Sequence, residues 1–200
     1  MSVATAVAGL LLAAGAGRRM GGPKALLRDP RGVPYVDRAI GSLLAGGCGS
    51  VTVVLGAAAD DARVLLDEAG WSASPSVDTV VAAEWEQGMG ASLRTGLVTL
   101  EDQPVDGALV SLVDLPDVDA AVVRRVLDLG AGALSLVRAT YSGRPGHPVL
   151  IGREHWRGVA SAAQGDQGAR DYLDTHGAAL CECGDLATGR DLDRPGDLRA

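Results

Sequence analysis

Residues 7–24 read VAGLLLAAGAGRRMGGPK, and the rest of the chain is best understood by working outward from them. The run Val7–Ala14 is apolar without polar alternation, which is typical of a strand buried on both faces of a parallel sheet. The loop that follows has glycines at positions 15, 17, 21 and 22, which let backbone N–H groups approach a bound group, and Arg18, Arg19 and Lys24 add positive charge. Backbone donors and cations after a first strand predict a site for a polyphosphate.

Two common phosphate-binding loops do not fit this spacing. A dinucleotide loop needs G-x-G-x-x-G opening a helix, but Met20 stands at the third glycine position and Pro23 disfavours a continuous helix. A P-loop needs G-x-x-x-x-G-K-[ST], but Pro23 separates Gly22 from Lys24. A plain glycine-rich turn with solvated charges stays open as the alternative.

Composition and charge narrow the class of protein. A chain of 200 residues that is 47% hydrophobic and 22% charged suits one globular domain, which we place at residues 1–200. The net charge of −7 argues against a nucleic-acid partner. The three cysteines are too sparse for a disulfide framework, and the first apolar run is too short for a membrane span or signal peptide. We therefore expect a cytoplasmic protein that does not bind membranes.

The order of apolar runs and amphipathic segments predicts an α/β fold. Strands are expected over 7–14, 51–55, 77–82, 107–113 and 133–139, and helices over 33–44, 60–69, 118–129 and 152–163 and after Ser92. This alternation predicts a mainly parallel sheet with helices on both faces. Residues 140–151, with two prolines, are expected to form a loop. Leu55 is followed by glycine and alanines rather than an acidic residue, which counts against a dehydrogenase.

A second candidate site follows the strand predicted over 107–113. Asp114 comes at the end of this strand, and Pro116 stops it. A carboxylate at the carboxyl end of a central strand lies where doubly wound sheets bind ligands, and it suits Mg²⁺. The alternative is a helix cap, a task for which Asp117 or Asp119 is better placed.

The opening loop, L-A-A-G-x-G-x-R-M-G-x-P-K, resembles the signature of the MobA-like NTP transferase family, in its molybdenum cofactor (molybdopterin) cytidylyltransferase branch. The resemblance implies a three-layer α/β/α, Rossmann-like nucleotidyltransferase fold with a mixed, mostly parallel sheet. It also implies that the loop wraps a nucleoside triphosphate, with Arg19 and Lys24 facing its phosphates. Ala14 stands where guanylyl-transferring relatives have a second glycine, which favours CTP. The nucleotide-binding residues that it implies here are Leu12, Ala13, Ala14, Gly15, Gly17, Arg19 and Lys24.

Further segments are similar to motifs of the same family. The stretch from Gly88 is similar to G-M-x-x-S-L-R-x-G, which implies that Gly88 and Ser92 lie against the nucleotide, although Ser92 is also a candidate helix N-cap. L-x-D-x-P implies that Asp114 binds metal. The tail is similar to D-I-D-T-P-E-D-L, which implies Asp193 as the second ligand, with Asp191 as the fallback. Arg194 and Gly196 depart from that motif.

Two segments are implied to border the acceptor site. G-x-x-G-H-P-V-L contributes His147, and G-D-x-G-A-R contributes Asp166 and Arg170. The alternatives are a turn histidine bonded to backbone and an N-cap role of Asp166 for the next helix.

The reaction that the resemblance implies is transfer of a nucleoside monophosphate, CMP from CTP, to a phosphorylated acceptor such as molybdenum-bound molybdopterin. Arg19, Lys24 and Asp114 are the implied catalytic residues, and Asp114 and Asp193 hold Mg²⁺. A molybdenum enzyme or its chaperone is the implied protein partner. Two alternatives stay open: an NAD(P)H-dependent oxidoreductase of the same fold acting on a small heterocycle, and a non-catalytic carrier of molybdenum cofactor.

Overall fold

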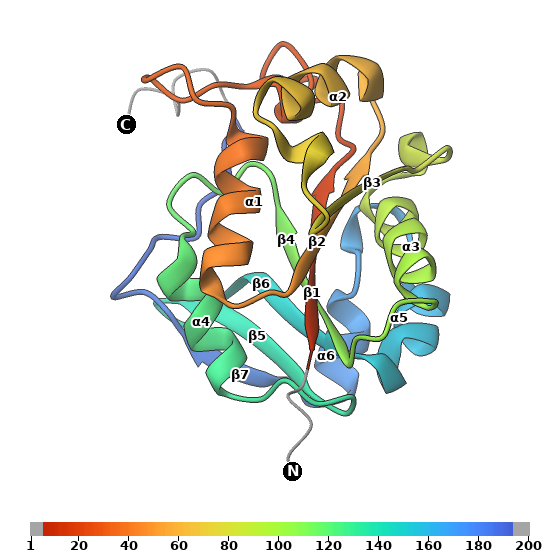
Figure 1. Cartoon of the computed structure of the whole chain (residues 1–200). Helices are drawn as coiled ribbons and strands as arrows, with labels where there is room; N and C mark the ends of the chain where they lie inside the picture. The colour runs from red at the N-terminus through yellow and green to blue at the C-terminus, as the bar shows by residue number, and fades with distance from the viewer. Residues whose placement is uncertain (1–5, 194–200) are drawn as a thin grey trace.

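A seven-stranded sheet forms the centre of the computed structural model, which describes residues 6–193 (Figure 1). Its order is β3-β2-β1-β4-β6-β5-β7, and among the described strands only β6 runs antiparallel to its neighbours. The predicted mixed, mostly parallel sheet is therefore confirmed. The strands are β1 (Val7–Ala13), β2 (Ser50–Leu55), β3 (Val77–Val81), β4 (Gly107–Leu112), β5 (Leu136–Tyr141), β6 (Arg144–Gly152) and β7 (Ala179–Glu182).

Helices cover both faces of this sheet and make the three layers. The core on one face is closed by α1 (Tyr35–Gly46), α2 (Ala59–Glu68) and α4 (Ala120–Asp128). The core on the other face is closed by α3 (Met89–Leu100), α5 (Trp156–Ala162) and α6 (Arg170–Thr175), which lie together in Figure 1. Among residues 6–193, no helix is both long and apolar enough to cross a membrane.

Strand β1 is buried along its whole length, as its unbroken apolar run predicts. It pairs in parallel with β2 on one side and β4 on the other, so that Leu11 lies opposite both Val53 and Ser111. Alternate side chains enter the two cores: Leu11 packs under α1, and Leu10 and Leu12 pack under α3. This central position brings the loop after β1 to the carboxyl end of the sheet, where parallel strands place ligand sites.

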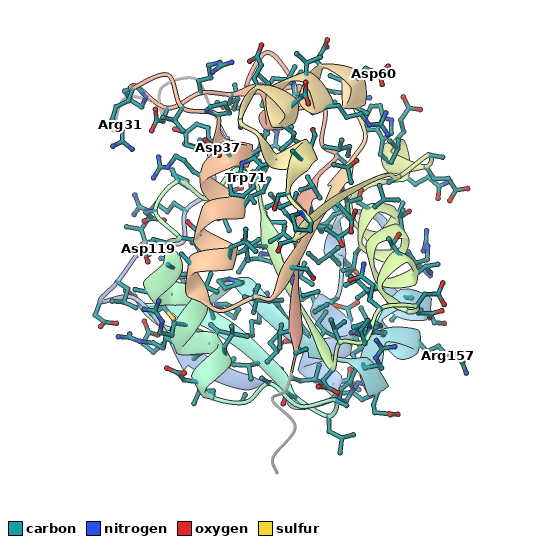
Figure 2. All side chains as sticks on the ribbon, in the orientation of Figure 1. Arg31, Asp37, Asp60, Trp71, Asp119 and Arg157 are labelled. Carbon is teal, nitrogen blue, oxygen red and sulfur yellow. The ribbon has the colours of Figure 1, made fainter. Side chains whose placement is uncertain are left out.

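Polar side chains define the ends of several surface elements. Asp119 is the N-cap of α4, where its carboxylate accepts hydrogen bonds from the N–H groups of Ala121 and Val122. The expectation that this residue, rather than Asp114, caps the helix is thus confirmed. The indole Nε1 of Trp71 donates to Asp37 Oδ1 over 2.7 Å and ties the chain after α2 to α1. Figure 2 shows these labelled side chains on the outer side of the helix layer.

Two expectations about local structure are wrong. Residues 144–152 form strand β6, not a loop, because Ser142 and Gly143, with φ of 52° and 76°, make a tight turn that returns the chain along β5. The prolines are accommodated because Pro145 and Pro148 precede the stretch of β6 that pairs with β4. Ser92 is not an N-cap: α3 begins at Met89 and buries Ser92 inside the helix.

Candidate active site

An open groove of about 610 Å³ lies at the carboxyl ends of β1 and β4. This is within the usual range of about 300–1,000 Å³ for ligand pockets, so the groove has room for a nucleotide. The loop after β1 forms one wall, and residues between β3 and α3 form the opposite wall. Sequence-predicted residues in its lining are Leu12, Ala14, Gly15, Gly17, Arg19, Lys24, Gly88, Ser92, Asp114 and Asp193. Ala13 is not among the lining residues, since it is buried in the core beneath α1.

The loop after β1 is shaped by close backbone approach. Gly17 has φ of 55°, and a Cβ at this position would lie 2.0 Å from the carbonyl oxygen of Gly22. The carbonyl of Gly17 accepts a hydrogen bond of 2.8 Å from Met20 N–H, which turns the chain back on itself. Pro23 then precedes a short 3₁₀ helix, η1 (Lys24–Leu26), and starts no α-helix. The loop thus differs physically from both a P-loop and a dinucleotide loop, as its spacing predicts.

The ammonium group of Lys24 lies between two carboxylates from distant parts of the chain. Its Nζ donates a short hydrogen bond to Asp114 Oδ2 and lies 3.5 Å from Asp193 Oδ1. The side chains of Lys24 and Asp114 are 19% and 9% exposed, so this ion pair is largely shielded from solvent. Residues separated by 90 and 169 positions therefore converge on one point of the groove.

Burial and charge act in opposite directions on these groups. Burial raises the pKa of Asp114, and the hydrogen bond and charge of Lys24 only partly offset it. Burial alone would lower the pKa of Lys24, but its bond to Asp114 and the charges of Asp114, Asp193 and Asp191 leave that pKa raised. Lys24 is therefore cationic at neutral pH, and the pair is an ionic one.

The tail of the chain reaches the site through a backbone contact. Leu192 N–H donates to the carbonyl of Asp114 over 3.0 Å, which brings Asp193 beside Lys24. Arg19 Nη1 also contacts Asp193 Oδ2 at 3.0 Å, with 80% of the arginine side chain exposed. The tail and the first loop thus close the groove from two sides. The departures at Arg194 and Gly196 lie outside the described residues.

An ion network around the buried carboxylate of Asp29 supports this end of the sheet. Asp29 is 5% exposed and accepts hydrogen bonds from the N–H groups of Arg31 and Val33. Arg38 on α1 bonds Asp29 Oδ2 and also donates to the carbonyl of Pro116 over 2.9 Å. The segment after Asp114 is therefore anchored to α1, which restricts where its carboxylate lies.

Two carboxylates that converge on one cation also fit a divalent metal. Mg²⁺ and similar ions need hard oxygen ligands and often use one or two carboxylates, with phosphates and waters completing the shell. Asp114 and Asp193 supply those oxygens at the point where Lys24 lies. Within residues 6–193, no group of three or more His, Cys, Asp or Glu side chains is arranged to hold a metal, so further ligands would come from the bound nucleotide and water.

The three predicted acceptor residues line a small cavity that adjoins the groove. His147 and Arg170 line this cavity alone, and Asp166 lines both the cavity and the groove. Asp166 does not cap the next helix, because it lies in the 3₁₀ helix η5 (Gly165–Gln167) and Ala169 is the N-cap of α6.

Other residues of this region did not emerge from the sequence. Trp85 and Glu86 line the groove from η3 (Trp85–Gln87). Asp191, the fallback metal ligand of the sequence analysis, lines it from the tail. Arg138 lines the neighbouring cavity from the middle of β5. The signal for Arg138 was present as a single arginine within an apolar strand, a position where buried charge has to be explained.

A model of the MobA-like NTP transferase domain matches residues 9–180. The chain belongs to the MobA-like NTP transferase family. The matched span includes the first loop, Asp114 and the acceptor-side segments, and it ends before Asp193.

A curated relative and several solved structures are similar to this family member along most of its length. The chain is 37% identical over 198 residues to "Nicotine blue oxidoreductase" of Paenarthrobacter nicotinovorans, covering 94% of this chain and 92% of that protein. It is 28% identical to Rv0371c from Mycobacterium tuberculosis H37Rv, with a TM-score of 0.79 and coverage of 98% and 97% of the two chains.

Two more structures bear on the fold and on metal binding. A nucleotidyl transferase from Methanothermobacter thermautotroptrophicus has a TM-score of 0.78 at 21% identity, covers 96% of this chain and 94% of its own, and shares the fold. A manganese complex of Rv0371c matches at 26% identity and a TM-score of 0.69, over 90% of this chain and 88% of that one. A divalent metal is usual among nucleotidyltransferases of this kind, and one MobA-like neighbour holds manganese.

Proposed function

We propose that this NTP transferase moves CMP from CTP to a phosphorylated acceptor, with molybdenum-bound molybdopterin as the leading acceptor, and releases pyrophosphate. The observation that carries the proposal is the convergence of Lys24, Asp114 and Asp193 in a groove large enough for a nucleotide. A cation and two hard carboxylates at one point are what phosphoryl chemistry requires, and they have no evident task in hydride transfer.

In this reaction, an oxygen of the acceptor phosphate forms a bond to the α-phosphorus of CTP. The bond from that phosphorus to the bridging oxygen breaks, and pyrophosphate leaves with its electron pair. A divalent metal, most simply Mg²⁺ held by Asp114 and Asp193, supplies charge stabilisation at the reacting phosphate when bound. Lys24 and Arg19 line the groove beside these carboxylates, and we assign to both the neutralisation of the departing phosphates.

Lys24 changes partners in this proposal. Without ligand its ammonium group neutralises Asp114 and Asp193, and these carboxylates would otherwise repel an anionic nucleotide. With a metal held by the same two carboxylates, Lys24 would be free to contact a phosphate. The exposed N–H groups of the loop at Gly15 and Gly17 are available for the same phosphates.

A nucleotide screen tests the donor preference. The four NTPs are added with Mg²⁺, and thermal unfolding is recorded. A ligand at a hundredfold excess over Kd stabilises by about 2.7 kcal/mol, so CTP should produce the largest shift. The preference for CTP rests on Ala14, which lines the groove where guanylyl-transferring relatives have glycine. Equal shifts with all four would contradict the cytidylyl preference, and no shift with any of them would contradict NTP binding.

A second candidate function has an observation in its favour. The curated relative at 37% identity carries the name of an oxidoreductase, so NAD(P)H-dependent reduction of a small heterocycle is the competing activity. Pyrophosphate release from CTP and NAD(P)H oxidation, measured on the same preparation, separate the two. Pyrophosphate release that depends on Asp114 supports transfer, and NAD(P)H oxidation without pyrophosphate supports reduction. Binding of molybdenum cofactor without pyrophosphate release or NAD(P)H oxidation would indicate a non-catalytic carrier of that cofactor.

A further inference from the structure

A second, more enclosed cavity of about 60 Å³ lies next to the groove, on the face of the sheet covered by α3 and α6. A cavity of about 10–15 Å³, measured in the same way, holds one water, so this cavity has room for several waters or for one small polyatomic anion. Leu12, Met89 and Asp166 line both spaces and form the boundary between them. The cavity is thus a side chamber of the groove rather than a separate surface feature.

Two arginines face this chamber from different elements. Arg138 comes from the middle of β5, where strand alternation places it on the same face of the sheet as Leu136. Arg170 comes from the first turn of α6, and His147 comes from β6. Most of the remaining lining is apolar, including Leu93, Val149 and Leu173. A buried arginine, Arg138, and an exposed one, Arg170, beside a largely apolar lining are arranged for a small anion.

The guanidinium of Arg138 is buried and its hydrogen bonding is incomplete. The residue is 8% exposed, and its Nε has no hydrogen-bond partner among residues 6–193. Its Nη1 lies 3.6 Å from Asp174 Oδ1, and that carboxylate is 67% exposed, so this ion pair only partly satisfies a buried guanidinium. A buried donor without a partner is uncommon in folded proteins, and a bound oxyanion would satisfy it.

The charges around the chamber favour an anion over a cation. Burial lowers the pKa of Arg138, and the neighbouring Arg170 lowers it further, while Asp174 acts in the opposite direction. Burial also lowers the pKa of His147 to about 4, with Arg138 and Arg170 contributing, so its ring is neutral near pH 7. Asp166 and Asp174 are the carboxylates nearest the chamber, and both are exposed to solvent.

We infer that Arg138 and Arg170 bind a compact oxyanion, a carboxylate or a phosphate, which the acceptor carries in addition to the group that reacts. This inference rests on the proposed transfer to an acceptor. The chamber is lined by neither Lys24, Asp114 nor Asp193, so an anion held there is not the one at the reacting phosphorus. The acceptor class is therefore a molecule with two anionic groups, one in the groove and one in the chamber.

The test uses the full chain with inorganic phosphate and, separately, acetate as probes. The Nε–Hε signal of Arg138 is followed by ¹⁵N NMR, with thermal unfolding recorded in parallel. An Arg19→Ala/Lys24→Ala background removes the main cations of the groove, so that the signal reports on the chamber. We expect saturable shifts of the Arg138 signal with at least one probe, and the stronger of the two identifies phosphate or carboxylate as the group.

Arg138→Met and Arg157→Met are the matched variants. Arg157 is exposed on α5, and Figure 2 shows it pointing away from the body of the protein. Arg138→Met should bind the probe roughly tenfold to a hundredfold more weakly, because a charge-assisted, forked contact is lost. It should melt at the same temperature as wild type or higher, since methionine replaces a poorly paired buried charge. Arg157→Met should bind the probe like wild type.

The outcomes separate this inference from the proposed function. An Arg138 signal that responds to neither probe overturns the chamber as an anion site, even where CTP with Mg²⁺ binds the groove. So does full probe binding by Arg138→Met. A response to phosphate or acetate without any response to NTPs supports the chamber while contradicting the proposed reaction. A failure of Arg138→Met to fold would mean that the guanidinium is needed for folding. In that case the wild-type protein decides: a shift of the Arg138 signal with the probe supports the inference, and no shift overturns it.

Discussion

The groove and the chamber beside it handle positive charge in opposite ways. In the groove, Lys24 lies between Asp114 and Asp193, so the cation is neutralised by the protein itself. In the chamber, Arg138 has one exposed carboxylate partner at 3.6 Å and an Nε without a partner among the described residues. An anion entering the groove therefore has to replace an existing ion pair, whereas one entering the chamber satisfies a donor that is already desolvated.

The residues that line the two sites also come from different kinds of structural element. The groove is built on loops that follow parallel strands, and these are held by glycine turns and by the Asp29–Arg38 network. The chamber is built on the faces of β5 and β6, the antiparallel part of the sheet, and is covered by α3, α6 and residues 166–169. Its strand residues are fixed by pairing in the sheet, whereas Asp166 and Arg170 come from the segment that covers it.

The largest expected effect is a loss of nucleotidyl-transfer rate when a carboxylate of the groove is replaced. Asp114→Asn should lower the rate of nucleotidyl transfer by about 10²–10³, since it removes one of two carboxylates that face the reacting phosphates. Pyrophosphate release measures the rate, and circular dichroism checks the fold. Asp78→Asn, at an exposed position on β3, is the matched control and should retain wild-type turnover. Wild-type-like turnover in Asp114→Asn would rule out its role in the reaction.

We expect His147 in the chamber to make the free energy of unfolding depend on pH in the acid range. Burial, with help from Arg138 and Arg170, lowers the pKa of His147 from 6.5 to about 4. As pH falls through 6.5 the unfolded chain takes up a proton that the folded protein does not accept until about pH 4. The stability that neutral His147 contributes is therefore complete above pH 6.5 and is lost toward pH 4. At about 1.4 kcal/mol per pH unit, the loss amounts to roughly 3 kcal/mol.

Urea unfolding across this pH range measures the effect. His147→Gln has no imidazole to titrate and should lose less stability between neutral pH and pH 4 than wild type. Parallel curves for the two proteins would mean that His147 is not held neutral in the chamber.

We expect the packing beside the boundary between groove and chamber to be sensitive to one methyl group added at Gly88. Gly88 precedes α3 with φ of 104° and ψ of −175°, a conformation that essentially only glycine adopts. A Cβ there would lie 2.6 Å from the carbonyl carbon of Gly165. Gly88→Ala should destabilise the protein by about 1–3 kcal/mol. The matched control, Gly41→Ala, lies within α1 where a Cβ meets nothing within 4 Å, and it should stabilise slightly. Equal urea midpoints would contradict this account of the packing.

The smallest effect is expected at the turn between β5 and β6. Glu182 on β7 accepts hydrogen bonds from Gly143 N–H, the Thr140 hydroxyl and the N–H groups of Gly184 and Ser142, which lower its pKa from 4.5 to about 2. Its contribution to stability is present above pH 4.5 and is lost as pH falls toward 2. The carboxylate is exposed, so the effect is small. Acid unfolding of Glu182→Gln should be shallower in this range, and an unchanged profile would mean that solvent screens these bonds.

The parallel half of the molecule was predicted best, because its site residues belong to short local motifs. The glycine spacing from Gly15 to Gly22 and the carboxylate after an apolar strand can each be recognised within one short stretch of chain. The structure brings them to one groove because parallel strands all present their carboxyl ends at the same edge of the sheet. The family resemblance then added the tail at Asp193, which no local pattern links to the first loop.

The antiparallel half was predicted less well. Pro145 and Pro148 suggested a loop, but β6 carries them where it has a single neighbouring strand. In the parallel half, the helix after Gly88 starts three residues before Ser92, because glycine backbone geometry rather than a side-chain cap begins it. The first error reflects strand pairing and the second reflects backbone geometry, and residue types alone display neither.

The sequence by itself determined that residues 7–24 form a buried strand and a glycine-rich, cationic loop that is neither a P-loop nor a dinucleotide loop, because apolar continuity and glycine spacing are properties of one segment. Only the tertiary structure decided that Lys24 is held between Asp114 and Asp193, and that Arg138 faces a closed chamber. The chamber is assembled from β5, β6, α3 and α6, so its donors come from segments that meet only when the antiparallel strand β6 completes the sheet.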